Sequence, residues 1–193
     1  MELTELGEVF PILGSGLPRA PGLHLTDIIK HIQDTINPYK GDGFDNMALT
    51  AEIGFIWEDL LSYVLGNRMG KRLNDLECDG IYCNPDGVGY DPLDGVTPVV
   101  EEYKCTWRSI NKPPTENPRY MMQIKSYCHV LKMKVVVMHI CYLMGDYKGS
   151  GPLARSYRIE FTEQEIEENW NVILAHKDAT IKAMALSQSN ESK

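Results

Sequence analysis

The segment from Cys83 to Lys104 reads CNPDGVGYDPLDGVTPVVEEYK, and the chain is organised around it. Asp86 heads one short expected strand, and Glu102-Tyr103-Lys104 ends the next one. Side chains alternate between the two faces of a strand, so Glu102 and Lys104 point the same way while Tyr103 points to the opposite face. We therefore expect two carboxylates and one ammonium to converge on a single point.

Such a convergence suits the hydrolysis of phosphodiester bonds. Oxygen ligands from Asp86 and Glu102 are the donors that Mg²⁺ or Mn²⁺ prefers, and Mg²⁺ keeps several waters while it shares other positions with phosphate oxygens. The metal would lower the pKa of a bound water and stabilise the charge that develops on the phosphate. Lys104 would lie near the attacking water, as a positioning group or as a base if its pKa is depressed.

Two other interpretations of this stretch remain open from the residues alone. An acid followed by a Glu-x-Lys triplet also occurs in ordinary surface hairpins, where the charges are solvated. Asp79 is a rival for the metal-binding aspartate because it too precedes a glycine in an expected strand. It lies farther from Glu102 along the chain and lacks the bend that Pro85 introduces before Asp86. Asp86 is therefore the better candidate.

Length and composition indicate a single globular domain. The chain has 193 residues, of which 43% are hydrophobic, which is enough for one core and too little for two. Its net charge of −8 argues against a protein that coats nucleic acid without specificity. The segment 101–134 nevertheless contains seven basic and three acidic residues. A local basic groove is therefore compatible with the acidic total.

The cysteines and the hydropathy pattern favour a cytoplasmic protein. Five cysteines without a CxxC pair signal neither a disulfide framework nor a zinc cluster. The longest apolar run, 135–144, is far shorter than a membrane span. The N-terminus shows no basic region followed by a hydrophobic segment, so we expect neither secretion nor a membrane partner.

The order of the expected elements is that of an α/β protein. Residues 1–23 read as an irregular arm and residues 187–193 as a disordered tail. Apolar residues recur with a helical period in some segments, and with a strand period or as continuous runs in others. The expected helices are 26–37, 47–65, 117–133 and a final helix opened by a capping box of Thr162 and Glu165; the expected strands are 76–83, a short strand up to Tyr90, 99–105, 134–144 and 155–161.

Two places suggest a surface that contacts nucleic acid. Trp107 and Arg108 directly follow the strand that ends in Lys104, where an indole could stack on a base and a guanidinium could hold a phosphate. Ordinary half-buried packing of Trp107 is the alternative. In the helix 117–133, positions 119, 123 and 127 lie in one row. The basic and aromatic candidates for DNA contact are Trp107, Arg108, Lys112, Arg119 and Lys125.

Four motifs follow one another along the chain: Gly54-x-x-x-Glu58, Asn84-Pro85-Asp86-Gly87, Glu102-Tyr103-Lys104-Cys105 and Gln123-x-x-x-Tyr127. This series, over about residues 50–145, resembles the RecB-type and lambda-exonuclease-like (YqaJ-like) branch of the PD-(D/E)xK nuclease superfamily. The resemblance implies a restriction-endonuclease-like α/β core, in which a central mixed sheet is flanked by helices on both sides. It also implies that residues 1–193 form a single nuclease domain.

The resemblance implies a metal site built from named residues. Asp86 and Glu102 would be metal ligands, and the backbone carbonyl of Tyr103 would also face the metal. Glu58 would hold a second metal or a coordinated water. Lys104 would be the catalytic lysine. The implied cofactor is Mg²⁺, with Mn²⁺ as a possible substitute, as one or two ions.

The resemblance also implies supporting residues. Gln123 and Tyr127 would orient the lysine, the water or the scissile phosphate. Some relatives carry an iron–sulfur cluster held by one early and three late cysteines. Because this chain has no cysteine before Cys78 or after Cys141, we expect no such cluster.

Our leading hypothesis is a Mg²⁺-dependent exonuclease that acts on linear double- or single-stranded DNA, of the kind phages and bacteria use for recombination or repair. By resemblance alone, we also expect a homo-oligomeric ring, a single-strand annealing partner, and the cytoplasm of a bacterium or phage-infected cell. A structure-selective or sequence-specific endonuclease on the same fold and a catalytically inactive DNA-binding subunit remain as alternatives. No clear arginine matches a 5′-phosphate anchor, so the polarity of digestion stays open.

Overall fold

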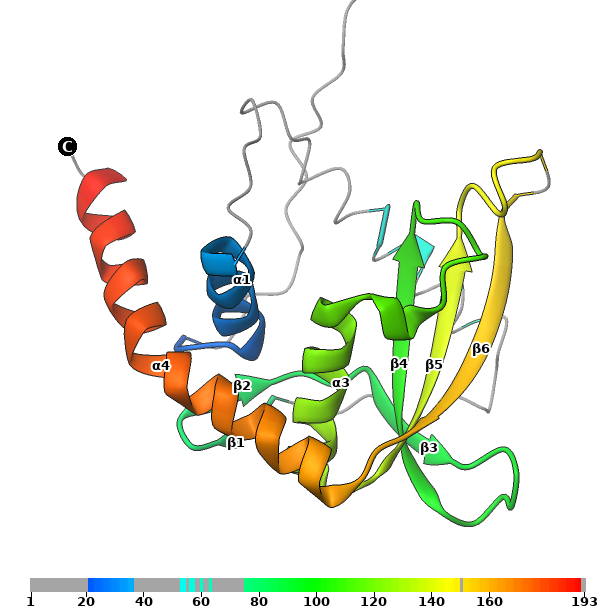
Figure 1. Cartoon of the computed structure of the whole chain (residues 1–193), viewed down its shortest axis with the longest axis horizontal. Helices are drawn as coiled ribbons and strands as arrows, with labels where there is room; N and C mark the ends of the chain where they lie inside the picture. Colours follow the sequence, from blue (N-terminus) through cyan, green and yellow to red (C-terminus); the bar gives the residue numbers. More distant parts are fainter. Residues whose placement is uncertain are drawn as a thin grey trace, which may run out of the picture.

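The structure is a computed structural model that describes residues 21–36, 75–149 and 151–191, together with the helical positions 53, 54, 56, 57, 60 and 63. A four-stranded sheet in the order β3-β4-β5-β6 forms its centre, and β1 and β2 form a separate two-stranded sheet (Figure 1). The strands are β1 (Leu76–Cys78), β2 (Ile81–Cys83), β3 (Gly87–Tyr90), β4 (Pro98–Thr106), β5 (Val135–Tyr142) and β6 (Leu153–Glu160). The helices are α1 (Leu25–Ile36), η2 (Pro114–Glu116), α3 (Pro118–Leu131) and α4 (Glu163–Glu191).

The four-stranded sheet is mixed, as predicted. β4 pairs with β3 in antiparallel and with β5 in parallel orientation, and β5 pairs with β6 in antiparallel orientation. α3 lies in the crossover that the parallel pair β4–β5 requires. Every residue of β5 is buried, in keeping with its continuous apolar sequence and its place inside the sheet. These features confirm the predicted α/β fold.

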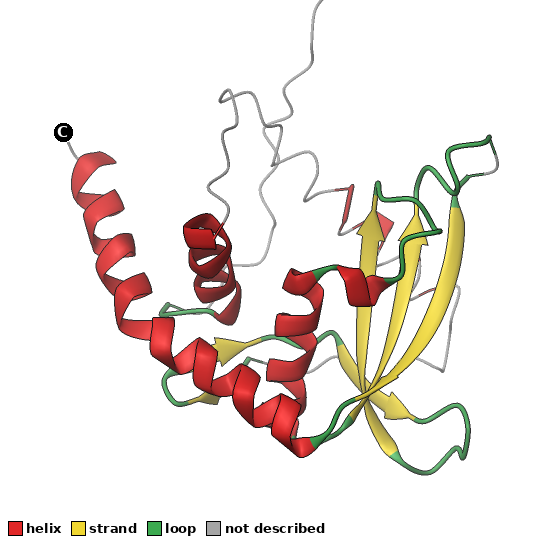
Figure 2. Cartoon of the chain, viewed as in Figure 1, coloured by secondary structure: helices red, strands yellow, loops and turns green. Residues whose placement is uncertain are grey.

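Helices contact both faces of the sheet. α1, α3 and α4 lie on one side of it in Figures 1 and 2, and they share one apolar core with side chains of β4 and β5. The strand residues of that core are Val100, Val136, Met138, Ile140 and Tyr142. On the opposite face, the helical residue Trp57 packs against Tyr103 and Cys141. The middle of the sheet is therefore shielded from water on both sides.

Local hydrogen bonds set the starts of the helices. The predicted capping box of α4 is confirmed: the Thr162 hydroxyl accepts from the Glu165 backbone N–H at 3.2 Å, and the Glu165 carboxylate accepts from the Thr162 N–H at 2.9 Å. The sequence predicts a helix over 26–37, whereas α1 begins at Leu25 and follows His24. The Asp27 N–H donates to the His24 carbonyl at 3.0 Å, and Asp27 Oδ2 accepts from the His24 N–H at 3.1 Å. The Asp27 carboxylate thus holds the residue before the helix, and α1 begins one residue earlier than predicted.

Two predicted segments differ from the structure. The sequence predicts one strand over 76–83, but these residues form the β1–β2 hairpin, because Asp79 (φ 53°) and Gly80 (φ 70°) take the left-handed conformation of a tight turn. α4 extends to Glu191, so part of the predicted disordered tail is helical. Residues 1–20 of the predicted arm and most of the predicted helix 47–65 lie outside the described residues. Within the described part of the chain, none of the helices has the length and apolar character that crossing a membrane requires.

Gly89 in β3 leaves space for a buried carboxylate. A Cβ at Gly89 would lie 2.1 Å from Glu101 Oε1 and 2.7 Å from Glu101 Cδ. The Glu101 side chain is held in place because it is buried and accepts a hydrogen bond from the Tyr103 hydroxyl. We expect Gly89→Ala to lower the free energy of unfolding by about 1–3 kcal/mol, the usual cost of overpacking. The midpoint of urea unfolding measures this change.

The matched background for this prediction is Glu101→Ala, which removes the atoms that the new methyl group would meet. In that background the cost of Gly89→Ala should shrink, since the two residues are in contact and their effects should not add. An equal loss of stability in both backgrounds would contradict the clash.

Candidate active site

Asp86 lies where the pairing of β3 with β4 stops. The paired register of β3 begins at Gly87, and the residue before it, Asp86, contacts β4 through its side chain. Its Oδ2 atom accepts a hydrogen bond from the backbone N–H of Tyr103 at 2.7 Å. The structure thus brings the first predicted carboxylate to the backbone of the second predicted motif.

Glu102 and Lys104 lie on the face of β4 that α3 covers. Glu102 is fully buried, and its carboxylate forms an ion pair with Lys104, whose side chain is 18% exposed. A buried carboxylate needs a charged or hydrogen-bonding partner to offset its desolvation. The pair therefore places a negative and a positive group at one point, in keeping with the spacing of the two residues.

α3 adds a phenol and an amide near these groups. Gln123 Nε2 donates a hydrogen bond to the Tyr127 hydroxyl at 2.8 Å, so these two positions form the row predicted for this helix. Tyr127 is 2% exposed. Burial raises the pKa of Tyr127 well above its usual value, and the negative charges of Glu102 and Asp86 raise this pKa further. Tyr127 is therefore a neutral phenol within the field of both carboxylates.

The donor set at this edge of β4 fits a hard divalent cation. Asp86 and Glu102 supply carboxylate oxygens. The N–H and C=O of one strand residue point to the same edge, so the Tyr103 carbonyl faces the edge at which Asp86 accepts the Tyr103 N–H. Mg²⁺ and Mn²⁺ prefer such oxygen ligands together with water. The residues present fit the predicted metal, and their roles as ligands stay predictions.

The predicted ligand Glu58 lies outside the described residues. Its neighbour Trp57 is described and packs on Tyr103 and Cys141, on the face of the sheet opposite to Glu102. A role of Glu58 at a second metal ion stays a prediction.

A buried polar network on the opposite face of the sheet is absent from the sequence prediction. The Tyr103 hydroxyl donates to Glu101 Oε2 at 2.5 Å, and the Tyr103 ring stacks on His139 with 5.1 Å between the ring centroids. His139 Nδ1 and the Ser156 hydroxyl form a hydrogen bond of 2.7 Å. Burial, and then the contact with Glu101, raises the pKa of Tyr103. The sequence signal for this network is Gly89, because a glycine inside a strand indicates a close approach.

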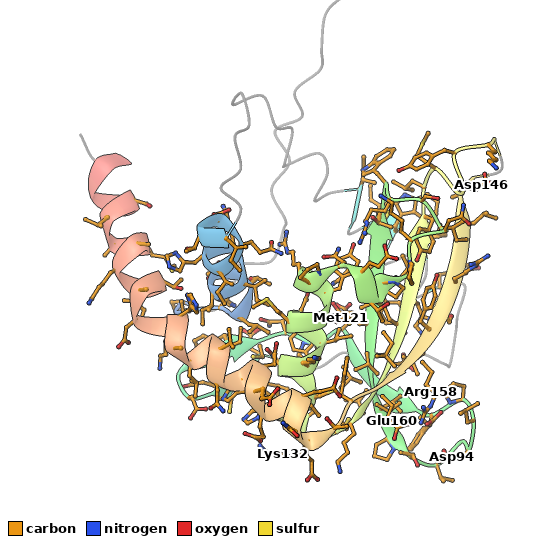
Figure 3. The ribbon with its side chains drawn as sticks, viewed as in Figure 1. Asp94, Met121, Lys132, Asp146, Arg158 and Glu160 are labelled. Atoms are coloured by element: carbon orange, nitrogen blue, oxygen red, sulfur yellow. The ribbon has the colours of Figure 1, made fainter. Side chains whose placement is uncertain are left out.

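The residues predicted to contact DNA lie beyond the C-terminal end of β4 and on α3. Trp107 directly follows β4 and is 50% exposed, and its carbonyl accepts a hydrogen bond from the Tyr147 hydroxyl. Arg108 is half-buried, whereas Lys112 and Arg119 are exposed. Figure 3 shows the loop that follows β5, marked by Asp146, at this same end of the sheet. DNA contact by these residues stays a prediction.

Lys125 contacts residues close to the N-terminal end of α4. Its Nζ atom lies 3.9 Å from Glu165 Oε1 and 5.3 Å from the centroid of the Phe161 ring. Glu165 lies in the first turn of α4, and Phe161 lies in the connection between β6 and α4. DNA contact by Lys125 stays a prediction.

The mixed sheet, its flanking helices and the carboxylates along β4 define an α/β protein with a restriction-endonuclease-like core. Neither a protein-family model nor a curated protein matches this sequence. Solved structures do match the fold, among them the alkaline exonuclease LHK-Exo from Laribacter hongkongensis, with 16% identity, a TM-score of 0.54 and coverage of 89% of this chain and 93% of that chain.

Two further solved structures match at similar levels. LHK-Exo in complex with dAMP matches with 15% identity, a TM-score of 0.52 and the same coverage of 89% and 93%. The protein SSO0001 matches with 14% identity, a TM-score of 0.53 and coverage of 88% of this chain and 79% of that chain. At such identities the matches establish the fold alone. They confirm the core that the four motifs implied.

Proposed function

We propose that this chain is a metal-dependent deoxyribonuclease that degrades linear DNA from its ends. The observation that carries the proposal is the hydrogen bond from the Tyr103 N–H to Asp86, because it joins Asp86 to the strand that presents Glu102 and Lys104. Two carboxylates and an ammonium beside one segment of β4 are the groups that metal-assisted phosphodiester hydrolysis requires.

In this proposal, Asp86, Glu102 and the Tyr103 carbonyl hold Mg²⁺, with Mn²⁺ as a substitute. When bound, the cation supplies Lewis acidity, which lowers the pKa of a bound water and offsets the charge developing on the phosphate. Glu102 is fully buried, so its charge acts in a medium of low dielectric constant, where electrostatic interactions are stronger than in water. Glu58 would serve a second ion.

Lys104 and Tyr127 are proposed to act on the water and on the phosphate. The ion pair with Glu102 fixes the position of the Lys104 ammonium, which can donate to the attacking water or to a phosphate oxygen. Tyr127 stays protonated because its pKa is raised, so its O–H can donate to a phosphate oxygen. Gln123 donates to the same hydroxyl and so fixes the direction of the phenol O–H.

DNA contact is proposed for the basic and aromatic side chains near this point. Arg119, Arg108 and Lys112 would contact phosphates, and the exposed indole of Trp107 would stack on a base. Phosphate contacts release counterions from DNA, so we expect binding to weaken as the salt concentration rises.

Action at DNA ends is supported by the solved structures. LHK-Exo is described as an alkaline exonuclease and has been solved with dAMP, a mononucleotide. The match covers 93% of that protein. We therefore propose that the present chain releases mononucleotides or short oligonucleotides during recombination or repair of DNA. A ring-shaped homo-oligomer and an annealing partner stay predictions from the sequence resemblance.

Cleavage of three DNA forms in parallel tests the proposed function. End-labelled linear duplex, linear single strand and closed circular DNA are incubated with the protein and Mg²⁺ or Mn²⁺. We expect a linear form to lose its label as short products, the closed circle to stay intact, and EDTA to stop the reaction. Nicking of the closed circle would identify an endonuclease instead. Bound but intact DNA with both metals, at several salt concentrations, would identify an inactive binding subunit.

A further inference from the structure

A second group of metal-binding side chains lies at the junction of the β1–β2 hairpin with α3. One ligand atom each of Cys78, Asp79 and His129 lies within 4.8 Å of the other two. Cys78 ends β1, Asp79 begins the hairpin turn, and His129 lies in the last turn of α3. We propose that these three side chains bind a zinc ion.

The chemistry of the donors identifies the kind of cation. A thiolate, an imidazole and a carboxylate are the sulfur, nitrogen and oxygen ligands that Zn²⁺ takes in proteins, whereas Mg²⁺ prefers oxygen ligands alone. The Cys78 thiolate and the Asp79 carboxylate together balance the charge of a divalent ion, and His129 ligates as a neutral ring. This donor set differs from the oxygen ligands of the candidate active site. The two sites should therefore select different metals.

Side chains of α4 contact two of the three ligands, Asp79 and His129. Trp170 Nε1 donates a hydrogen bond to Asp79 Oδ2 at 2.9 Å, and the indole stacks on the His129 ring with 4.6 Å between the ring centroids. Glu167 Oε1 lies 3.4 Å from His129 Nδ1. A carboxylate beside a ligating imidazole, and a donor to a ligating carboxylate, are the usual supports of a metal site. These two ligands are thus oriented by the fold itself.

The hairpin turn presents two adjacent ligands to one point. Asp79 adopts a left-handed backbone conformation, which is uncommon for a residue other than glycine. The Lys177 ammonium donates to the Asp79 carbonyl, so α4 holds the backbone of the turn. The Asp79 carboxylate remains directed at Cys78, whose Sγ lies 3.7 Å from Oδ2.

An ion at this place would join two elements that carry the candidate active site. The hairpin continues through β2 to Asp86, and α3 carries both His129 and Tyr127. Binding of Cys78 and His129 to one ion would fix the hairpin against α3. We therefore assign the ion a structural role, in which zinc raises the thermal stability of the folded chain.

Zinc titration of the full chain tests this proposal. The protein is stripped with EDTA, dialysed and titrated with Zn²⁺, in a parent that carries Asp86→Asn and Glu102→Gln so that the candidate active site does not compete. We expect one equivalent of Zn²⁺ to bind and to raise Tm. With Co²⁺ in place of Zn²⁺, we expect a thiolate-to-cobalt charge-transfer band in the near ultraviolet.

Variants of the ligands separate this site from other metal contacts. Cys78→Ala and His129→Ala should lose the zinc equivalent, and Cys78→Ala should also lose the cobalt–thiolate band. Cys105→Ala is the matched control, because Cys105 is half-buried like Cys78 but lies in β4. It should keep both signals.

A variant outside the ligand set distinguishes loss of zinc from loss of folding. Glu167 is 61% exposed in its side chain, so Glu167→Ala should leave the fold intact. It should weaken zinc binding by about 10–100-fold, the usual effect of removing a group that orients a metal ligand. Absence of zinc binding in the parent, absence of the cobalt–thiolate band, or unchanged affinity in the Cys78, His129 and Glu167 variants would each overturn the proposal. The titration measures metal alone, so its result is independent of whether the chain cuts DNA.

Discussion

Lys104→Ala should lower Mg²⁺-dependent cleavage of linear DNA by about 100–1,000-fold, the usual effect of removing one preorganised donor from a developing charge. The Lys104 ammonium lies on the face of β4 that carries Glu102, where it would position the water and stabilise the phosphate. Single-turnover cleavage of an end-labelled duplex measures the loss. DNA binding in EDTA should stay within a few-fold of the wild-type value, because the lysine acts on one phosphate rather than along the duplex.

The same variant removes the counter-charge of Glu102, which is fully buried. An uncompensated buried charge costs about 3–5 kcal/mol, so Tm should fall. The double variant Lys104→Ala and Glu102→Gln should recover much of this stability, because a neutral amide replaces the buried charge, and it should still fail to cleave. Full activity in the single variant would contradict the role of Lys104. Unfolding of both variants would show that Lys104 is a structural residue.

Asp86→Asn should reduce cleavage by about a hundredfold or more and weaken the binding of Mn²⁺, with little change in Tm. The asparagine carbonyl can still accept the hydrogen bond that Asp86 takes from the Tyr103 N–H, so the contact between β3 and β4 survives. The variant loses the negative charge of one proposed ligand, and with it part of the several kcal/mol that a bound metal contributes to hydrolysis. Calorimetric titration with Mn²⁺ and single-turnover cleavage measure the two effects.

Asp94→Asn is the matched control for this substitution. Asp94 lies in the β3–β4 turn and accepts hydrogen bonds from the backbone N–H groups of Val96 and Thr97, both at 2.9 Å. Figure 3 shows Asp94 at the end of the sheet opposite to the loop that holds Asp146. Its replacement should leave Mn²⁺ binding and cleavage unchanged. Equal losses at positions 86 and 94 would mean that overall charge sets the activity, and full activity of Asp86→Asn would remove Asp86 from the site.

Several features of the sheet and of the candidate site follow from patterns within single elements. The apolar run of β5 predicts a strand buried on both faces, and every residue of β5 is buried. The Glu-x-Lys spacing predicts that Glu102 and Lys104 share a face, and the two form an ion pair. The capping box at Thr162 is likewise local, since both partners lie within one helical turn.

Contacts between distant parts of the chain overrode the local prediction elsewhere. The strand predicted over 76–83 is divided at Asp79, whose side chain accepts from Trp170 and whose carbonyl accepts from Lys177. Both donors belong to α4, and they lie 91 and 98 residues after Asp79 along the chain. The spacing of apolar residues around these positions does not indicate such contacts.

Which side chains share a face of one strand or helix follows from the sequence alone, because the repeat of the backbone conformation sets it. Which faces meet depends on how the helices and strands pack together in three dimensions. The contact of Asp86 with the Tyr103 amide and the grouping of Cys78 and Asp79 with His129 are of this second kind. They depend on how separate elements pack, since burial of apolar surface brings residues together without regard to their distance along the chain.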